Sequence, residues 1–319
     1  MKYRTLGQTS LEVSEIGLGA YPLSGQDVWS GTTDDESVAL IHRCQELGVN
    51  LIDSAEGYGA GHSEDLTGIA LKGRRDKWVV ATKVTPNRGL DREKPDEQAA
   101  RNRIREACEG SLKRLQSDYI DLYQLHAIPF DWAMPVTMST LAELQKEGKI
   151  RWYGISTNNR DAIDRLGAHG PIHLLQVGYN LLERAADELL HWAKEKKIGT
   201  LIRVPLAKGQ LSGKYFGPNA EKIPEGDTRY ERFQSSDVQE GLKKLPELLF
   251  LQNEKRTMVQ AALRFVLDHP GVSCVIAGAK NRQQVEQNAQ ASEMVPITDE
   301  ELAKALPLAD TIGTGRWVG

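Results

Sequence analysis

The chain has 319 residues, of which 40% are apolar and 26% are charged, as in ordinary globular proteins. Its net charge of −4, with both signs interspersed, gives no electrostatic reason to expect a nucleic-acid partner. No window reaches the roughly 18 uninterrupted apolar residues of a membrane span, and the first residues form no apolar signal segment. Cys44, Cys108 and Cys274 lack disulfide or metal spacing, so we expect reduced, buried thiols in a cytoplasmic protein.

A repeated alternation of strand-like and helix-like segments organises most of the chain. Residues 2–16 alternate apolar and polar side chains around a Gly7-Gln8-Thr9-Ser10 turn, which predicts a β-hairpin ahead of the main fold. The predicted strands are 15–20, 48–53, 78–84, 119–126, 150–156, 172–179, 199–205 and 272–277. The predicted helices are 34–47, 63–72, 97–115, 135–148, 159–167, 186–197, 257–269, 281–292 and a further one near 299–309. Eight such units predict α/β architecture with parallel strands, as a closed (β/α)8 TIM barrel in preference to an open doubly wound sheet.

One long segment, residues 207–256, interrupts the repeat after the seventh strand. Loops of this length in compact domains are usually lids or binding loops. Its part 237–253 has helical periodicity interrupted by Pro246. No low-complexity linker divides the chain, so we expect a single domain over residues 1–319.

Several motifs of other chemistries are incomplete in this sequence. The glycines at 57, 59 and 61 have the wrong spacing for a dinucleotide fingerprint. The stretch 209–215 resembles a P-loop, but it is one residue short and ends in Tyr215. No Cys/His cluster with ligand spacing is present, so no metal site is predicted.

Three successive predicted strands each end with an ionisable side chain in the same phase. Because side chains two residues apart on a strand share a direction, Asp53, Lys83 and His126 should lie in one phase at the ends of their strands. Tyr58 follows Asp53 on a glycine-rich loop. The C-terminal rim is where barrel active sites lie, so these four residues form the candidate catalytic set.

The chemistry of this set is coherent. A phenol with a free pKa of about 10 is a weak acid, and a neighbouring ammonium would lower its pKa. We expect Lys83 to supply that charge, Asp53 to fix and balance Lys83, and His126 to orient a carbonyl oxygen. The set suits protonation of an oxyanion as it forms, and it requires a hydride donor from elsewhere for redox chemistry.

These motifs resemble the aldo-keto reductases. The resemblance rests on Asp53-Ser-Ala-Glu-Gly-Tyr58-Gly-Ala-Gly-His-Ser-Glu, Ala-Thr-Lys83 and Leu-Tyr-Gln-Leu-His126, which follow one another in the family order over nearly the whole chain. It implies a (β/α)8 barrel that binds NADP(H) without a Rossmann motif, with Tyr58 as general acid. It also implies the cofactor contacts Gly19, Ala20, Tyr21, Asp53, Ser156, Thr157, Gln176, Arg203, Pro205, Leu206, Lys208, Gly209, Lys214, Gly278, Lys280, Gln284 and Asn288.

Two cofactor positions depart from the family pattern. Thr157 stands where the family commonly has Asn, and Arg203 stands where many members place a Tyr against the nicotinamide ring. A guanidinium can also lie flat on a ring. Lys280 and Arg282, at the start of a predicted helix and without an acid before Glu286, favour NADP(H) over NAD(H).

The substrate rim is the least determined part of the sequence. Candidates are Trp29 and Trp132, together with Tyr21, residues 229–233 and Trp317, although both Trp29 and Trp132 could equally be loop anchors. We expect reduction of a small-molecule aldehyde or ketone, with no prediction of the oligomeric state. Two other classes stay open: an NADP(H)-binding sensor or regulatory subunit with slow redox turnover, and an aldolase in which Lys83 forms a Schiff base.

Overall fold

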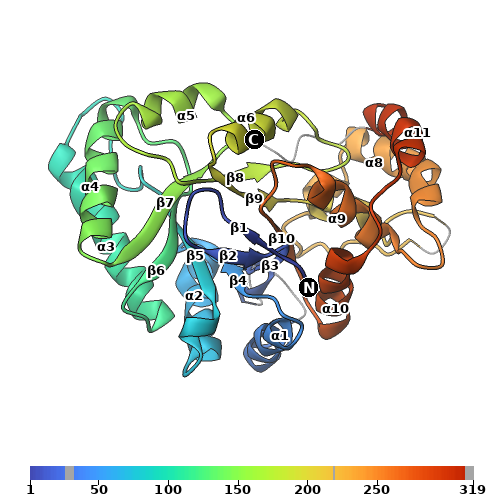
Figure 1. Ribbon diagram of the computed structural model, residues 1–319, viewed down its shortest axis with the longest axis horizontal. Helices are drawn as coiled ribbons and strands as arrows, with labels where there is room; N and C mark the ends of the chain where they lie inside the picture. The colour runs from blue at the N-terminus through green and yellow to red at the C-terminus, as the bar shows by residue number, and fades with distance from the viewer. Residues whose placement is uncertain (26–31, 218–219, 313–319) are drawn as a thin grey trace.

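Eight parallel strands close into a barrel at the centre of the molecule (Figure 1). The computed structural model describes residues 1–25, 32–217 and 220–312. The barrel strands follow one another in chain order, with the last closing on the first. They are β3 Ile16–Gly19, β4 Leu51–Asp53, β5 Val79–Val84, β6 Ile120–Leu125, β7 Ile150–Ser156, β8 Leu174–Gly178, β9 Gly199–Arg203 and β10 Cys274–Gly278. The predicted closed barrel is therefore confirmed, and the open sheet is excluded.

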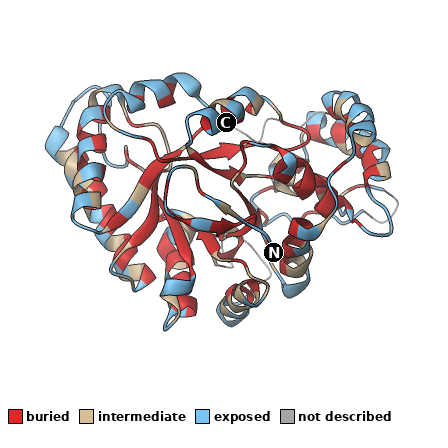
Figure 2. Cartoon of the chain, viewed as in Figure 1, coloured by how far each residue is buried: buried red, intermediate tan, exposed pale blue. Residues whose placement is uncertain are grey.

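A ring of helices surrounds the barrel and buries its outer face (Figure 2). Three of the helices, α1 (Asp34–Glu46), α9 (Met258–Asp268) and α11 (Asp299–Asp310), each begin with a Thr capping box, which satisfies backbone N–H groups at the helix start. The helices of the repeat are α1 Asp34–Glu46, α2 His62–Leu71, α3 Glu97–Leu115, α4 Met134–Lys146, α5 Arg160–Gly167, α6 Asp187–Glu195, α9 Met258–Asp268 and α10 Arg282–Gln290, with α11 Asp299–Asp310 beyond them. Each predicted helix is present with its ends shifted by at most a few residues.

The N-terminal hairpin closes one end of the barrel. Its strands, β1 Tyr3–Thr5 and β2 Glu12–Ser14, pair antiparallel as predicted. Leu6, Leu11 and Val13 of the hairpin join the apolar cluster inside the barrel, which includes Leu51 and Leu122. Because this end is filled with side chains, a ligand has to approach the carboxyl ends of the strands.

The segment after β9 folds into short helices with a small core of its own. It contains η5 Ala207–Ser212, α7 Tyr230–Phe233, α8 Ser236–Lys244 and η6 Leu245–Leu251. Ile223, Phe233 and Val238 bury one another in this segment. The break predicted at Pro246 falls where α8 gives way to η6.

Two further sequence expectations concern the thiols and membrane insertion. All three cysteines are buried and unpaired, and burial raises the pKa of Cys44 and Cys108 to about 12. Over the described ranges, no helix combines the length and the apolar character that a bilayer crossing needs.

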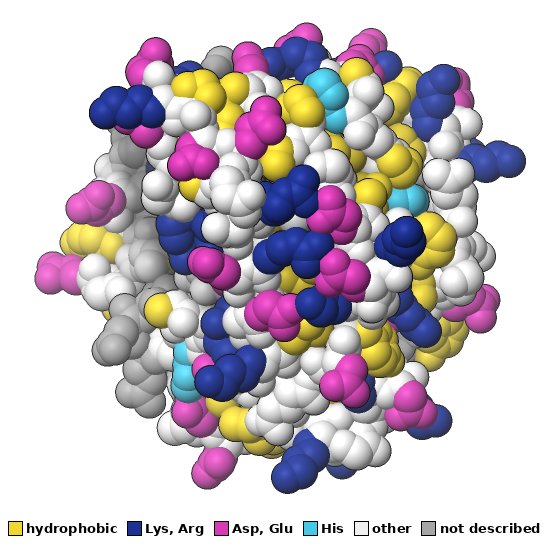
Figure 3. Space-filling view, turned by 90° about the vertical axis from the view of Figure 1, so that its left-hand side faces the viewer, with side chains coloured by type: hydrophobic (Ala, Val, Ile, Leu, Met, Phe, Trp, Pro, Cys, Tyr) yellow, Lys and Arg dark blue, Asp and Glu magenta, His cyan; other side chains and the backbone are white. Residues whose placement is uncertain are grey.

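On the face that Figure 3 presents, basic and acidic side chains alternate and do not gather by sign. Ion pairs such as Arg101–Glu143 join α3 to α4.

Candidate active site

A buried ion pair lies where β4 and β5 end. Lys83 is fully buried, and its ammonium donates hydrogen bonds to Asp53 Oδ2 at 2.7 Å and to the carbonyl oxygen of Ser54 at 2.7 Å. The same ammonium lies 3.2 Å from the hydroxyl oxygen of Tyr58. The structure thus brings three of the four candidate catalytic residues into direct contact.

Two glutamine side chains complete the surroundings of Asp53. Gln124 and Gln176 donate to Asp53 Oδ1 at 3.0 and 2.9 Å, and Gln176 also donates to Gln124 at 3.2 Å. Ser156 donates to Gln176 Oε1 at 3.3 Å, which extends the network to β7. Gln124 lies two residues before His126 and so shares its direction along the strand, but we predicted no role for it. Its amide helps Lys83 to satisfy the buried carboxylate.

The pKa of Tyr58 shifts in the opposite direction to the sequence-based expectation. Burial raises the pKa of Tyr58, the Lys83 ammonium opposes this shift, and the charge of Asp53 acts with burial. The net pKa is therefore raised, whereas we expected the ammonium to lower it. Conversely, although burial alone would lower the pKa of Lys83, Asp53 and Tyr58 together raise it. The site accordingly pairs a neutral phenol with a charged ammonium.

His126 lies beside Tyr58 at the rim and carries no charge at neutral pH. The two rings are 5.8 Å apart between centroids and meet edge to face. Burial, together with the charges of Lys83 and Arg203, lowers the pKa of His126 to about 4. A neutral imidazole can still donate one hydrogen bond to a carbonyl oxygen. Tyr21 packs against the other side of Tyr58, with 5.0 Å between ring centroids.

The loop that carries Tyr58 needs glycine at two of its three glycine positions. Gly59 and Gly61 have φ values of 58° and 102°, and a Cβ atom on Gly59 would lie 2.0 Å from the carbonyl oxygen of Ser24. Gly57, with φ of −83°, has a conformation open to any residue. The glycines therefore allow a left-handed backbone path, which turns η2 Tyr58–Gly61 back over the rim.

A cavity of about 1150 Å³ opens at this end of the barrel, and Tyr58 and His126 form part of its wall. This volume exceeds the usual range of roughly 300–1,000 Å³ for pockets that bind one drug-sized molecule. Most residues expected to contact a cofactor line it: Gly19, Ala20, Tyr21, Asp53, Ser156, Gln176, Arg203, Pro205, Leu206, Lys208, Gly209, Lys214, Gly278, Lys280, Gln284 and Asn288.

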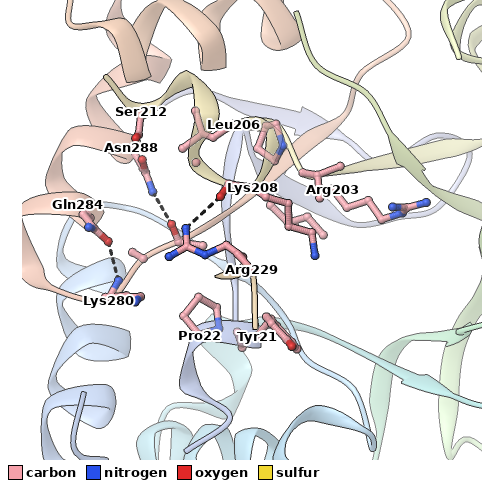
Figure 4. A pocket seen from close by; sticks show the side chains of 18 of the residues that line it. Tyr21, Pro22, Arg203, Leu206, Lys208, Ser212, Arg229, Lys280, Gln284 and Asn288 are labelled. Carbon is pink, nitrogen blue, oxygen red and sulfur yellow. Dashed lines mark hydrogen bonds between the residues drawn. The ribbon is translucent and has the colours of Figure 1, made fainter. Parts of the chain in front are cut away.

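Cationic side chains from distant segments meet along this cavity (Figure 4). Arg229 donates to the carbonyl oxygen of Lys208 at 3.0 Å and forms an ion pair with Asp227 at 2.7 Å. Burial and neighbouring cations lower the pKa of Lys208 and of Lys280. Because nearby positive charges destabilise each ammonium, a bound polyanion would relieve their repulsion.

Near α10, side chains of this helix hydrogen-bond to the backbone of residues 278–280, which also line the cavity. Gln284 accepts from the backbone N–H of Lys280 at 2.8 Å, and Asn288 donates to the carbonyl oxygen of Gly278 at 3.3 Å (Figure 4). Lys280 also lies 3.9 Å from Asp227. Sequence reasoning missed this carboxylate, because Asp227 lies 53 positions before Lys280 in the chain.

Three predicted contacts are not supported by their positions. Thr157 lies outside the cavity lining and accepts from the backbone N–H of Asn159 at 3.1 Å. Trp132 also lies outside it, and its indole donates to the carbonyl oxygen of Arg92 at 3.0 Å, which is an anchoring contact between two loops. Arg282 is 70% exposed, pairs with Glu286 and does not line the cavity. Trp29 and Trp317 lie outside the described residues.

The residues expected around the substrate rim between 229 and 233 have other positions. Arg229 belongs to the cationic group described above, and Phe233 is buried in the small core of the segment after β9. Tyr215, which we did not single out as a ligand contact, lies 3.3 Å from Arg229 and lines the cavity. This segment therefore faces the cationic part of the cavity, whereas Tyr21 faces Tyr58.

A second polar cluster lies between α6 and the end of α9. Asp187, His191 and His269 bring their donor atoms within 4.8 Å of one another, as metal ligands would. The backbone N–H of Gly271, however, donates to His269 Nδ1 at 3.0 Å. The proton of the neutral ring is therefore on Nε2, which faces Asp187 at 3.3 Å. Because a metal needs the lone pair of that nitrogen, we interpret the cluster as a close polar contact between α6 and the end of α9 and not as a metal site.

Comparison with known proteins adds independent evidence. A model of the Aldo/keto reductase family matches residues 15–306. Over 302 residues the chain is 37% identical to aldo-keto reductase YhdN of Bacillus subtilis, covering 90% of this chain and 87% of that protein. Over 311 residues it is 32% identical to an NADH-specific methylglyoxal reductase of Escherichia coli, covering 91% and 93%. An aldo-keto reductase of Klebsiella pneumoniae, solved in complex with NADPH, matches with a TM-score of 0.72 and 28% identity over 97% of this chain and 96% of that one. The chain therefore belongs to the aldo/keto reductase family.

Proposed function

We propose that this protein reduces aldehydes or ketones to alcohols with NADPH, and that Tyr58 protonates the carbonyl oxygen. The observation that carries the proposal is the 3.2 Å contact between the Tyr58 hydroxyl and the Lys83 ammonium, beside a cavity lined with cations. The cofactor would supply the hydride. The chain itself would bind, orient and protonate the substrate.

Each residue of the site has a distinct task in this proposal. The raised pKa keeps Tyr58 protonated at neutral pH, so it can donate as negative charge develops on the substrate oxygen. Lys83 stabilises the tyrosinate that results, and Asp53 keeps Lys83 charged. Neutral His126 donates a hydrogen bond to the same oxygen and fixes its direction. Ser156 and Gln176 would hold the amide of the nicotinamide on the β7–β8 side of the cavity.

The residues present fit a dinucleotide phosphate. Arg203, Lys208, Arg229 and Lys280 line the cavity, and the start of α10 favours a bound anion. NADP(H) is therefore the proposed cofactor, as in the Klebsiella relative that was solved with NADPH. The negative charge of Asp227 beside Lys280 weakens the positive potential at that end of the cavity, so we expect only a modest preference for NADP(H) over NAD(H). Lys280→Ala should raise the Kd of NADPH more than that of NADH, whereas equal effects on both would contradict the assignment.

The contacts of Lys83 also bear on the aldolase alternative. A Schiff base requires an accessible, neutral amine. Here the amine is fully buried, its pKa is raised by Asp53 and Tyr58, and it donates three hydrogen bonds. These observations support a structural and electrostatic role for Lys83 over a nucleophilic one.

The decisive experiment is an NADPH oxidation assay over a panel of small aldehydes and ketones. We expect turnover in the wild type and a loss of more than about 100-fold in kcat for Tyr58→Phe, since general acid catalysis is worth roughly 10²–10⁴-fold. The Kd of NADPH should stay nearly unchanged in that variant. Tight cofactor binding without turnover in the wild type would instead favour the sensor alternative, and wild-type kcat in Tyr58→Phe would refute the role of Tyr58.

A further inference from the structure

A buried carboxylate lies two residues before Tyr58 and takes no part in the chemistry described above. The side chain of Glu56 is 6% exposed, on the loop between β4 and η2. Its oxygen Oε1 accepts a hydrogen bond from the backbone N–H of Thr85 at 2.8 Å and forms an ion pair with Arg103 of α3. The backbone N–H of Glu56 in turn donates to the carbonyl oxygen of Lys83 at 3.2 Å.

Arg103 closes these contacts into a ring. Its Nε donates to the carbonyl oxygen of Thr85 at 3.1 Å, while its other nitrogen contacts Glu56. Thr85 is two residues beyond Lys83 and lines the cavity. The Glu56 clamp, defined as Glu56, Arg103 and the backbone of Thr85, therefore ties the segment that carries Tyr58 to the end of the strand that carries Lys83.

The loop beyond Tyr58 has an uncommon backbone conformation that needs support from surrounding contacts. Gly59, Ala60 and Gly61 all have positive φ, and the Ala60 value of 52° is an uncommon conformation for a residue with a side chain. Conformations of this kind persist when the surrounding contacts over-determine them. The Tyr58–Lys83 contact joins two separate segments, so it depends on how well these segments are fixed against each other.

We propose that Glu56 is a positioning residue, and that the Glu56 clamp sets the distance between the Tyr58 hydroxyl and the Lys83 ammonium. This inference rests on the proposed function in that Tyr58 donates the proton. A misplacement of about 1 Å in a reacting group can lower a rate by about 100-fold. Loss of the clamp should therefore reduce kcat, while the cavity cations on β9, just before α10 and in the segment after β9 stay in place.

Asp121, at the opposite end of the barrel, offers a matched control. Its carboxylate is 1% exposed, accepts from the backbone N–H of Val80 at 3.0 Å and pairs with Arg75 at 2.7 Å. It thus has the same kinds of partner as Glu56, a backbone N–H and a guanidinium, but it does not line the cavity. An effect that comes only from the loss of a buried carboxylate should therefore appear both when Glu56 and when Asp121 is replaced.

The test compares Glu56→Ala, Glu56→Gln, Arg103→Met and Asp121→Ala. We expect kcat to fall about 100-fold in Glu56→Ala, with the Kd of NADPH within about 2-fold of wild type. Glu56→Gln, which keeps an acceptor for Thr85, should recover part of that loss. Asp121→Ala should lose thermal stability but keep kcat within about 3-fold. If Glu56→Ala does not fold, Glu56→Gln and Arg103→Met decide in its place.

A second readout does not depend on catalysis. Amide hydrogen exchange of residues 54–61 should be faster in the Glu56 and Arg103 variants and unchanged in Asp121→Ala. If the wild type lacks turnover, the proposed function fails, and this exchange measurement still decides whether the clamp fixes the loop. Unchanged exchange, or a fall in kcat as large in Asp121→Ala as in Glu56→Ala, would overturn the inference.

Discussion

Replacing Asp53 with Asn would expose the electrostatics of the site most directly. Asp53 Oδ2 accepts from the Lys83 ammonium, and its Oδ1 accepts from Gln124 and Gln176. Both oxygens thus face donors. An Asn side chain keeps the shape, but its NH2 group must face either the ammonium or the two amides. The variant therefore loses one set of hydrogen bonds and the charge that balances Lys83.

The magnitude follows from the burial of the pair. Lys83 is fully buried and Asp53 is 2% exposed. Breaking a buried pair by removing one partner destabilises a protein by about 3–5 kcal/mol. At pH 7 we expect Asp53→Asn to lose stability in this range. The kcat should fall as well, because the ammonium beside Tyr58 is no longer maintained.

The pH dependence of that loss is the distinguishing feature. In the wild type, Asp53 and Tyr58 raise the pKa of Lys83, so the unfolded and folded states both bind its proton near neutral pH. In Asp53→Asn, burial is left to dominate and places the folded pKa of Lys83 below its unfolded value of about 10.4. The unfolded state then binds more protons, so the stability of the variant rises with pH by up to about 1.4 kcal/mol per pH unit.

Urea denaturation at pH 7 and pH 9 checks this reasoning, with Asp121→Asn as the control. Asp121 pairs with Arg75 and Arg151, whose guanidinium groups keep their protons throughout this range. The destabilisation should therefore shrink between pH 7 and pH 9 in Asp53→Asn and stay constant in Asp121→Asn. A destabilisation by Asp53→Asn that is equal at both pH values would refute the account of Lys83.

Two further changes test local parts of the site. Gly59→Ala should destabilise the protein by more than about 2 kcal/mol in urea denaturation, because the cost of the left-handed conformation adds to that of a 2.0 Å contact between the new Cβ and the Ser24 carbonyl oxygen. In Gly57→Ala the free energy of unfolding should stay within about 0.5 kcal/mol of wild type. Equal losses in both variants would contradict the assigned loop path. Burial lowers the pKa of His126 to about 4 in the folded protein, whereas the unfolded chain protonates this imidazole below about pH 6.5. The stability should therefore fall by about 3 kcal/mol as the pH is lowered from about 6.5 to about 4. His126→Gln should remove this part of the pH dependence, and an unchanged slope between pH 7 and pH 4.5 would contradict it.

The barrel could be predicted from the sequence because its signals are local. Each strand shows apolar periodicity over a few residues, and alternation along a strand is enough to place Asp53, Lys83 and His126 in one phase. In the structure the inward-facing Leu51, Ala81 and Leu122 form the barrel interior. The same rule would have placed Gln124 next to the catalytic set, but a pattern cannot say that its amide reaches Asp53.

The parts that sequence reasoning missed depend on contacts between distant segments. Asp227 and Arg229 lie in the segment after β9, and no periodicity connects that segment to Lys280. Thr157 was predicted to contact the cofactor because it follows Ser156, yet its hydroxyl oxygen accepts a hydrogen bond from the backbone N–H of Asn159 in its own loop. Loop conformation depends on tertiary packing, here on the small core around Phe233, so these positions could not be derived from local spacing.

The pKa of Tyr58 shows why naming the right residues does not determine their chemistry. The expectation counted the Lys83 ammonium, which does lower the pKa. Asp53 lies against that ammonium, however, and its charge acts on the pKa of the phenol in the opposite direction. Burial then decides the direction, and the pKa is raised. For the proposed reduction this sign is the useful one, since a phenol that keeps its proton at neutral pH can give it up only when a stronger base forms beside it. The developing oxyanion of a reduced carbonyl would be that base, and Lys83 would stabilise the tyrosinate left behind.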